Sequence, residues 1–308
     1  MQRIGNTDLE VFPLCLGTNV FGWTADERDS FEVLDAYAEA GGNFLDTADS
    51  YSAWAPGHRG GESETIIGRW MAARTTRGRM IVGTKVGGLP TLRGLSEKTI
   101  RTAAEASLKR LGIERIDLYY AHVDDPATPL EESLGSFDAL VREGKVRYIA
   151  ASNYTAPRLA QALEVSDREG FARYAAIQPH YNLVHRKDYE GALSDLSVRE
   201  GLACVPYFAL ARGFLTGKYR LDATANSVRA ADARSYLHER GLRILAALDE
   251  IAAAHRTTVA ATALAWLRAQ PGVVAPIASA RTSSQLADLL PMATLTLTEA
   301  ELARLSAM

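Results

Sequence analysis

Short apolar runs alternate along the chain with longer segments of helical periodicity. The runs are apolar at successive positions, which is typical of strands covered on both faces. They comprise residues 14–16, 43–46, 80–85, 116–122, 146–152, 176–181, 203–207 and 273–277. Eight parallel strands close a barrel, whereas an open doubly wound sheet usually has five or six. No linker-like break divides the chain, so the pattern predicts one domain, residues 1–308, with an α/β (β/α)8 TIM-barrel fold.

Several of the intervening segments have the signals of complete helices. Residues 28–40, 96–111, 129–143 and 156–169 are amphipathic, and each is followed by a glycine. Glycine often ends a helix because it adopts the left-handed conformation without penalty. Ser96 is a candidate N-cap. Ahead of the first strand, residues 2–4 and 9–12 flank a turn-like segment and predict a β-hairpin.

The longest segment without clear periodicity, residues 219–236, follows the seventh strand. A loop of that length in a compact domain is usually functional or mobile. Because it follows a barrel strand, we expect it on the C-terminal face, where barrel active sites are built.

Composition narrows the function classes. Of 308 residues, 47% are apolar and 23% charged, and 34 Lys+Arg against 37 Asp+Glu give a net charge of −3. This is ordinary globular composition with no basic stripe, which disfavours nucleic-acid or anionic-membrane partners. No uncharged apolar stretch reaches the ~20 residues of a membrane span. The N-terminus lacks the apolar core of a secretory signal, so we expect a cytoplasmic protein.

Many familiar site motifs are missing. There is no Gly-x-Gly-x-x-Gly, Gly-x-Ser-x-Gly or His-Glu-x-x-His, and where a P-loop needs lysine the chain has Leu89. His180 and His185 lack an evident third ligand, so no metal is predicted. Cys15 and Cys204 are far apart within apolar runs, and we expect buried, reduced thiols.

Four polar side chains stand at the ends of three consecutive predicted strands. Asp46, Lys85 and His122 end their strands, and Tyr51 follows Asp46 by five residues. In a parallel barrel these ends are neighbours on one rim. Any one of these residues alone fits a structural ion pair. Together they are hard to explain as packing, since burying polar groups costs several kcal/mol unless they satisfy one another.

These residues belong to a longer series of motifs. In chain order the series is LGT at 16–18, NFLDTA at 43–48, Tyr51, GESE at 61–64, IG at 67–68, DLY at 117–119, GKVR at 144–147, SN at 152–153, Gln178, YNL at 181–183 and LTGK at 215–218. With this series the whole chain resembles the aldo-keto reductases. The resemblance implies a (β/α)8 barrel that reduces an aldehyde or ketone to the alcohol with a nicotinamide cofactor.

The resemblance assigns the catalytic tetrad to Asp46, Tyr51, Lys85 and His122. A carbonyl that accepts hydride needs a proton donor, and a phenol with an ordinary pKa of about 10 is protonated but a reluctant donor. A nearby ammonium favours the phenolate. Tyr51 is therefore the expected general acid, Lys85 its electrostatic activator, Asp46 the partner of Lys85, and His122 a donor to the substrate oxygen.

The cofactor residues implied by the resemblance follow later strands. Gly17 and Thr18 match the segment against the nicotinamide ribose, and Tyr207 matches the aromatic that stacks on the ring. Ser152, Asn153 and Gln178 match the groups that bind the carboxamide. The segment 210–218, with Leu210, Gly213 and Lys218, resembles the loop that cradles the pyrophosphate. The segment 277–289, with Arg281, Gln285 and Asp288, resembles the adenosine-binding stretch.

Arg281 carries the cofactor prediction, because a guanidinium suits phosphate recognition and therefore favours NADPH/NADP+ over NADH. The chain also departs from the family pattern. Phe208 and Ala209 replace the usual Ser-Pro, Ala278 and Ser279 replace Pro-Gly, and Leu289 replaces Asn. These changes remove polar contacts expected near the cofactor.

The candidate substrate residues are Phe21, Trp23, Trp54 and Asp124, with His58, Arg229, Arg234 and Tyr236 as further wall candidates. Aromatic side chains on the rim predict a small-molecule pocket with one apolar side. Asp124 and the loop arginines fit a polar substrate such as a keto-sugar, or equally fit solvated rim charges.

Two other functions remain open from sequence. One is an NADP-binding regulatory or sensory subunit with little turnover, since the resembling family also supplies channel-associated subunits. The other is a barrel isomerase or hydrolase that uses the same carboxylate and histidine without a nicotinamide. The oligomeric state stays undetermined.

Overall fold

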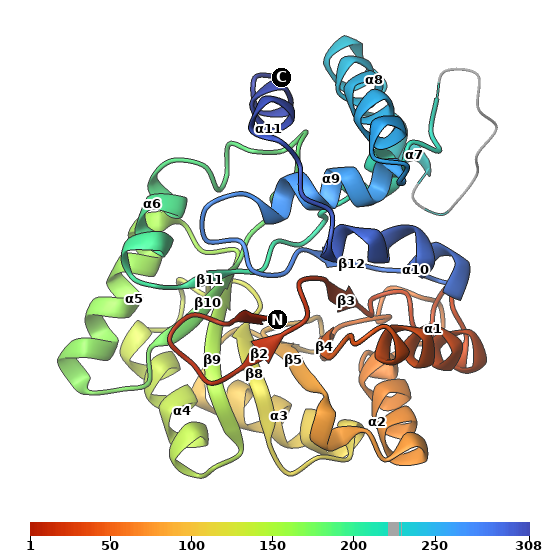
Figure 1. Ribbon diagram of the computed structural model, residues 1–308. Helices are drawn as coiled ribbons and strands as arrows, with labels where there is room; N and C mark the ends of the chain where they lie inside the picture. The colour runs from red at the N-terminus through yellow and green to blue at the C-terminus, as the bar shows by residue number, and fades with distance from the viewer. Residues whose placement is uncertain (221–227, 229) are drawn as a thin grey trace.

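The computed structural model describes residues 1–220, 228 and 230–308. Within this part of the chain, eight parallel strands form a ring at the centre of the molecule (Figure 1). Their spatial order is β12 (Ile277–Ala278), β3 (Cys15–Gly17), β4 (Phe44–Asp46), β5 (Ile81–Val86), β8 (Ile116–Ala121), β9 (Val146–Ser152), β10 (Tyr174–Gln178) and β11 (Ala203–Cys204). The ring closes because Val274 N–H donates to the Cys204 carbonyl at 3.0 Å and Ile277 N–H to the Pro206 carbonyl at 2.9 Å. The predicted eight-stranded barrel is confirmed.

Helices surround the ring on its outside (Figure 1). Their bounds are α1 (Glu27–Glu39), α2 (Glu62–Arg74), α3 (Glu97–Leu111), α4 (Leu130–Arg142), α5 (Ala156–Glu169), α6 (Ala192–Arg199), α7 (Ala230–Arg234), α8 (Glu239–Ala254), α9 (Val259–Arg268), α10 (Ser283–Leu289) and α11 (Glu299–Ser306). Short 3₁₀ helices are η1 (Arg77–Arg79), η2 (Ala211–Thr216) and η3 (Leu290–Ala293). The four helices predicted from sequence match α1, α3, α4 and α5 to within one residue at each end.

The helix ends follow the local rules of the sequence. Ser96 caps α3 by accepting a hydrogen bond from Thr99 N–H at 3.4 Å. Gly112 and Gly170 are C-caps with φ of 64° and 67°. Helix α2 was not singled out by the pattern, because Ser63 and Glu64 are buried beside its apolar side chains and blur its periodicity.

The N-terminal hairpin, β1 (Gln2–Arg3) with β2 (Glu10–Val11), is confirmed and pairs antiparallel. Its side chains Ile4, Leu9 and Val11 are buried in one cluster with inward-facing residues of the strands, such as Leu118. Figure 1 accordingly shows the N-terminus over the middle of the strand ring. The hairpin therefore closes one end of the barrel, and the site must lie at the other.

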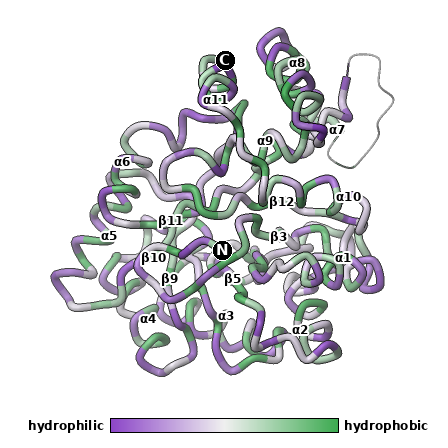
Figure 2. The backbone as a smooth tube through the Cα atoms, viewed as in Figure 1, coloured by the Kyte–Doolittle hydropathy of each residue, from purple (hydrophilic) through white to green (hydrophobic). Residues whose placement is uncertain are grey.

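Side-chain alternation along the strands decides which groups enter the barrel. In β4, Phe44 belongs to the inner cluster while Leu45 packs outward against the helices. In β8, Tyr120 points inward while Tyr119 packs outward. Figure 2 shows apolar residues along the central strands and polar residues on the outer turns of the helices. The same alternation turns Asp46 and Lys85 into the barrel near its open end.

The structure also bears on the two cysteines, on membrane-spanning helices and on the long segment 219–236. Cys15 and Cys204 are buried and free, as predicted. No helix among the described residues is long and apolar enough to cross a membrane. The segment 219–236, expected to be irregular, contains the short helix α7, and Arg229 lies outside the described residues.

Candidate active site

Asp46, Tyr51 and Lys85 form one buried hydrogen-bonded group at the open end of the barrel. The Lys85 side chain is 0% exposed and that of Asp46 2%. Lys85 Nζ donates to Asp46 Oδ2 at 2.7 Å, to the Thr47 carbonyl at 2.8 Å and to Tyr51 Oη at 2.8 Å. Since an ammonium has three N–H donors, each is satisfied. The cation is therefore fixed in position without water.

The Tyr51 hydroxyl has two ionic neighbours. Its Oη accepts from Lys85 and donates to Asp46 Oδ2 at 3.0 Å. Burial raises the pKa of Tyr51 well above its ordinary value of 10, and the Asp46 carboxylate raises it further. The ammonium alone favours the phenolate, but burial and the carboxylate outweigh it. The phenol thus holds its proton at neutral pH.

His122 completes the group from the end of β8. Its Nδ1 lies 3.5 Å from Ser50 Oγ, and its ring centre is 6.3 Å from that of Tyr51. A Cβ on Gly88 would come within 2.6 Å of His122 Nδ1, so this glycine makes room for the imidazole. Burial lowers the pKa of His122 to about 3, with a further contribution from Lys85. The imidazole is therefore neutral at pH 7 and keeps one N–H donor.

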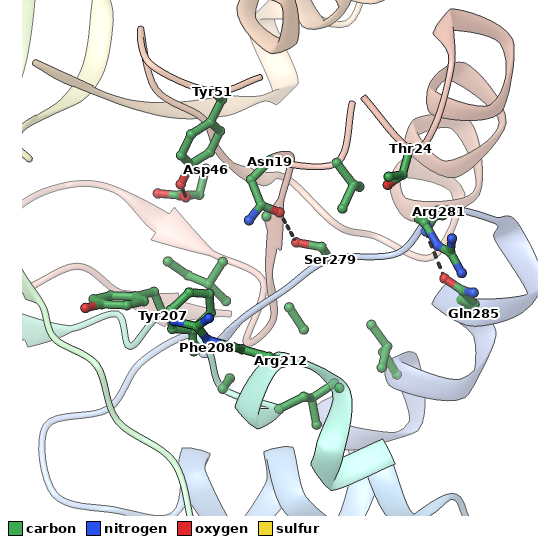
Figure 3. A pocket seen from close by; sticks show the side chains of 18 of the residues that line it. Asn19, Thr24, Asp46, Tyr51, Tyr207, Phe208, Arg212, Ser279, Arg281 and Gln285 are labelled. Atoms are coloured by element: carbon green, nitrogen blue, oxygen red, sulfur yellow. Dashed lines mark hydrogen bonds between the residues drawn. The ribbon is translucent and has the colours of Figure 1, made fainter. Parts of the chain in front are cut away.

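A cavity of ≈ 730 Å³ extends from these groups to the far side of the barrel mouth. Figure 3 shows Asp46 and Tyr51 at one side, Arg281 and Gln285 at the other, and Asn19 with Ser279 between them. The predicted residues that line it are Gly17, Trp23, Asp46, Tyr51, Trp54, His122, Ser152, Asn153, Gln178, Tyr207, Leu210, Gly213, Lys218, Arg281, Gln285 and Asp288. Lys85 lies directly behind Asp46 and Tyr51.

Several other predicted residues do not line the cavity. Thr18 is buried and its Oγ1 donates to the Asp46 carbonyl at 2.8 Å. Phe21 is buried in the outer core, contrary to the expectation that it lines a substrate pocket. Asp124 forms an ion pair with Arg158 at 2.8 Å instead of facing the cavity. His58, Arg234 and Tyr236 are likewise absent from its described lining.

The polar residues at the ends of β9, β10 and β11 hold one another in place. Gln178 Nε2 donates to Asp46 Oδ1 at 2.9 Å. Asn153, in the left-handed region with φ of 59°, donates to the His122 carbonyl at 2.9 Å and accepts from Tyr207 Oη at 2.8 Å. These bonds connect the tetrad to the neighbouring rim, so the strand ends are preorganised.

Two cationic side chains of the cavity lining, Lys218 and Arg281, make no ion pair with a described residue. Arg281 lies at the side away from Tyr51 (Figure 3). Arg212 pairs with Asp232, and its guanidinium lies 4.6 Å from the Phe208 ring centre. Phe208 and Arg212 have φ of 51° and 57°, a conformation that costs a non-glycine residue of order 1–3 kcal/mol. This strained backbone shapes the cavity wall.

Asn19 was missed from sequence, whereas Ser279 and Arg212 fall within the predicted cofactor segments 277–289 and 210–218 without being named as site residues. Asn19 and Ser279 hydrogen-bond each other at 2.9 Å across the middle of the cavity. Asn19 directly follows the motif at 16–18. A search for polar residues just after each predicted strand would therefore have found it. Arg212 lies in the predicted segment 210–218, but its place in the cavity wall depends on the left-handed backbone around it.

Comparisons with known proteins agree along the whole chain. A sequence model of the aldo/keto reductase family matches residues 13–308. The chain is 35% identical to "Uncharacterized oxidoreductase YrpG" of Bacillus subtilis, over 93% of this chain and 89% of that protein. It is 33% identical to "Norsolorinic acid reductase stcV" of Emericella nidulans, over 90% and 73%. It is also 30% identical to "Probable voltage-gated potassium channel subunit beta" of Arabidopsis thaliana, over 95% and 92%.

Proposed function

Because the chain belongs to the aldo/keto reductase family of oxidoreductases, we propose that it reduces an aldehyde or ketone to the alcohol, with NADPH as electron donor and Tyr51 as general acid. The observation that carries this proposal is the Tyr51 hydroxyl at the cavity wall, 2.8 Å from Lys85 Nζ and 3.0 Å from Asp46 Oδ2. A panel of aldehydes and ketones assayed with NADPH tests it. Reduction of at least one compound supports the proposal, and no reduction of any compound contradicts it.

Each member of the tetrad has a distinct task. Tyr51 gives its proton to the carbonyl oxygen, and Lys85 stabilises the phenolate that remains. Asp46 holds both groups and balances the charge of the ammonium. The neutral imidazole of His122 can donate a hydrogen bond to the same oxygen. It cannot act as a cation, so the proton comes from Tyr51.

The cavity fits a nicotinamide dinucleotide in size and in charge. Its ≈ 730 Å³ lie within the 300–1,000 Å³ usual for ligand sites. Lys218 and Arg281 line it, and Arg281 lies away from Tyr51, where a phosphate would bind (Figure 3). When bound, the reduced nicotinamide supplies the hydride. Ser152, Asn153, Gln178 and Tyr207 would hold the nicotinamide. Leu210, Gly213 and Lys218 would hold the pyrophosphate, and Arg281, Gln285 and Asp288 the adenosine.

Packing at the end of β3 explains Gly17, which also lines the cavity. A Cβ here would lie 2.7 Å from the Ile277 side chain and 2.8 Å from Ser279 Oγ. Glycine is therefore needed at the end of β3, where the cavity wall comes close to the neighbouring strand. The residues present are compatible with the proposed cofactor.

We expect Arg281→Ala to raise the Kd for NADPH by roughly 10- to 100-fold, the value of a hydrogen-bonded charge contact, and to leave the Kd for NADH nearly unchanged. Arg281 has no ion-pair partner among the described residues and lines the cavity. Fluorescence titration at low salt measures both constants. Arg158→Ala is the control, because Arg158 pairs with Asp124 away from the cavity. An unchanged Kd for NADPH would contradict the assignment.

The tetrad end of the cavity supports a substrate with an apolar or aromatic group. Trp23 and Trp54 meet edge to face at 5.5 Å, and the Trp54 ring lies 6.2 Å from that of Tyr51. Trp54 is 50% exposed, so part of its ring is free to contact a ligand. The keto-sugar alternative depended on Asp124 and the loop arginines, and Asp124 is instead paired with Arg158.

Trp54→Ala is expected to raise KM for benzaldehyde about fivefold and to change KM for a small aliphatic aldehyde little, because aromatic contacts contribute about 0.5–1.5 kcal/mol. Trp54→Phe should retain most of the wild-type KM. Steady-state kinetics at saturating NADPH measures these values. Equal effects on both aldehydes would show that Trp54 does not contact the substrate.

A second candidate is an NADP-binding regulatory subunit, favoured by the similarity to a protein named as a potassium channel β subunit. Such a protein would bind the cofactor with little turnover. The isomerase and hydrolase alternatives have no support from the family match.

A further inference from the structure

Asp49 is a buried carboxylate that the proposed reaction does not use. It lies between β4 and α2, three residues after Asp46 and two before Tyr51, and is 1% exposed. Neither of its carboxyl oxygens has a hydrogen-bond partner among the described residues. Its backbone N–H donates to the Lys85 carbonyl at 3.4 Å. A buried polar group without a partner is rare, because it loses its hydration without compensation.

Charged and phenolic groups from each neighbouring element face this carboxyl. They are Glu64 on α2, Arg110 on α3, Lys85 on β5 and Tyr119 on β8. Both carboxylate oxygens of Glu64 already accept hydrogen bonds: Oε1 from Thr84 Oγ1 at 2.5 Å and Oε2 from Arg110 Nε at 2.7 Å. The Tyr119 hydroxyl is buried and has no hydrogen-bond partner in the described part of the chain. Asp49 is therefore surrounded by charged groups, and its nearest acidic neighbour, Glu64, is already paired with Arg110.

Two glycines seal this cluster. A Cβ on Gly60 would lie 2.5 Å from the Asp49 carbonyl oxygen, and one on Gly61 would lie 2.3 Å from Arg110 Nε. Both have positive φ, 95° and 85°. Only glycine permits the chain to pass this closely to the Asp49 backbone carbonyl and the Arg110 guanidinium. The burial of Asp49 is thus built into the start of α2.

The surroundings of Asp49 also determine the pH at which its carboxyl ionises. Burial, and then the Glu64 carboxylate, raise the pKa of Asp49 to about 7, against a smaller opposite effect of Arg110. The tetrad behaves differently, since the pKa of His122 is lowered to about 3 and that of Tyr51 is raised well above 10. Neither of these groups titrates near neutrality.

We propose that Asp49 is a positioning residue for carbonyl reduction that acts through Lys85, so that the site is most active with this carboxyl neutral and slows when it ionises. This inference depends on the proposed function. The Asp49 carboxyl interacts electrostatically with Lys85. When ionised it adds negative charge that offsets the positive potential stabilising the Tyr51 phenolate. Release of the Tyr51 proton then becomes harder. The Asp49 proton itself goes to solvent and takes no part in the reduction.

The pH dependence of kcat for aldehyde reduction tests this proposal. For the wild type we expect kcat to fall roughly fivefold through a single ionisation near pH 7. Asp49→Asn should remove this decrease and keep the high rate above pH 7. The matched control is Asp138→Asn on α4, a buried carboxylate that accepts from Ala172 N–H at 2.9 Å. It should leave the decrease in place.

A second variant keeps the test decisive if Asp49→Asn folds poorly. Glu64→Gln removes the carboxylate that holds the Asp49 proton, so the decrease in kcat should move to lower pH. A wild-type profile that is flat from about pH 5 to about pH 9, or a decrease unmoved by both variants, would overturn the inference alone. Absence of turnover with every carbonyl would overturn the proposed function and this inference with it.

Thermal unfolding gives a readout independent of turnover. The folded protein holds the Asp49 proton up to about pH 7, whereas the unfolded chain releases it near pH 3.8. The folded state binds more protons between these values, so stability falls as pH rises through this window. In Asp49→Asn the Tm should fall less as pH rises through this window than in the wild type. In Asp138→Asn it should fall as much as in the wild type. Equal pH slopes for Asp49→Asn and the wild type would overturn the inference.

Discussion

Replacing Tyr51 with phenylalanine is expected to lower kcat for carbonyl reduction by about 10³-fold, within the 10²–10⁴ range of general acid–base catalysis, and to leave the Kd for NADPH within about twofold. The variant keeps the ring and removes only the hydroxyl that Lys85 and Asp46 hold. His122, neutral at pH 7, cannot replace the lost acid. Steady-state kinetics and fluorescence titration measure the two quantities.

The control for this variant is Tyr148→Phe. It removes a phenolic hydroxyl that donates to Asp8 at 2.9 Å, beside the N-terminal hairpin and far from the cavity. Its kcat should equal that of the wild type. If Tyr51→Phe retained more than about a tenth of wild-type kcat, another group would have to supply the proton.

The second large effect concerns Lys85. Lys85→Met should reduce kcat by at least about 10²-fold and destabilise the fold by about 3–5 kcal/mol, because it leaves the Asp46 carboxylate buried without its cation. Urea unfolding measures the free energy of unfolding, and the NADPH assay measures kcat.

The double variant Lys85→Met/Asp46→Asn separates the two roles of this pair. Removing both charges should restore much of the lost stability, since the isolated buried carboxylate is gone. Activity should stay low, because nothing stabilises the phenolate. Recovery of kcat in the double variant would show that Lys85 serves only to neutralise Asp46.

The barrel and the tetrad were predictable from sequence for a common reason. Each strand is a short apolar run, and Asp46, Lys85 and His122 stand where such runs end. Alternation along the strands then turns these side chains inward, while Thr18 points outward and hydrogen-bonds to Ser63 on α2 at 2.7 Å. The assignment of Thr18 to the cavity ignored this alternation. Phe21 lies in the loop after β3 and packs in the outer core.

Other features depend on partners far away in the chain. Asp124 is a reasonable rim candidate from sequence, but its partner Arg158 lies 34 residues further on, in α5. The cavity wall around Arg212 depends on left-handed backbone conformations at residues other than glycine. Such conformations are energetically unfavourable, so the sequence does not predict them. Asp49 looks like an ordinary loop carboxylate in sequence, because its burial arises from packing of four separate elements around it.

Single turnover of a preformed NADPH complex tests the central claim most directly. An excess of a reactive aldehyde is mixed with the complex, and the near-ultraviolet absorbance of the bound cofactor is followed. We predict a fast decay with one alcohol formed per NADPH oxidised. Tight binding of NADPH with no decay for any carbonyl would contradict the account and identify the chain as a binding subunit.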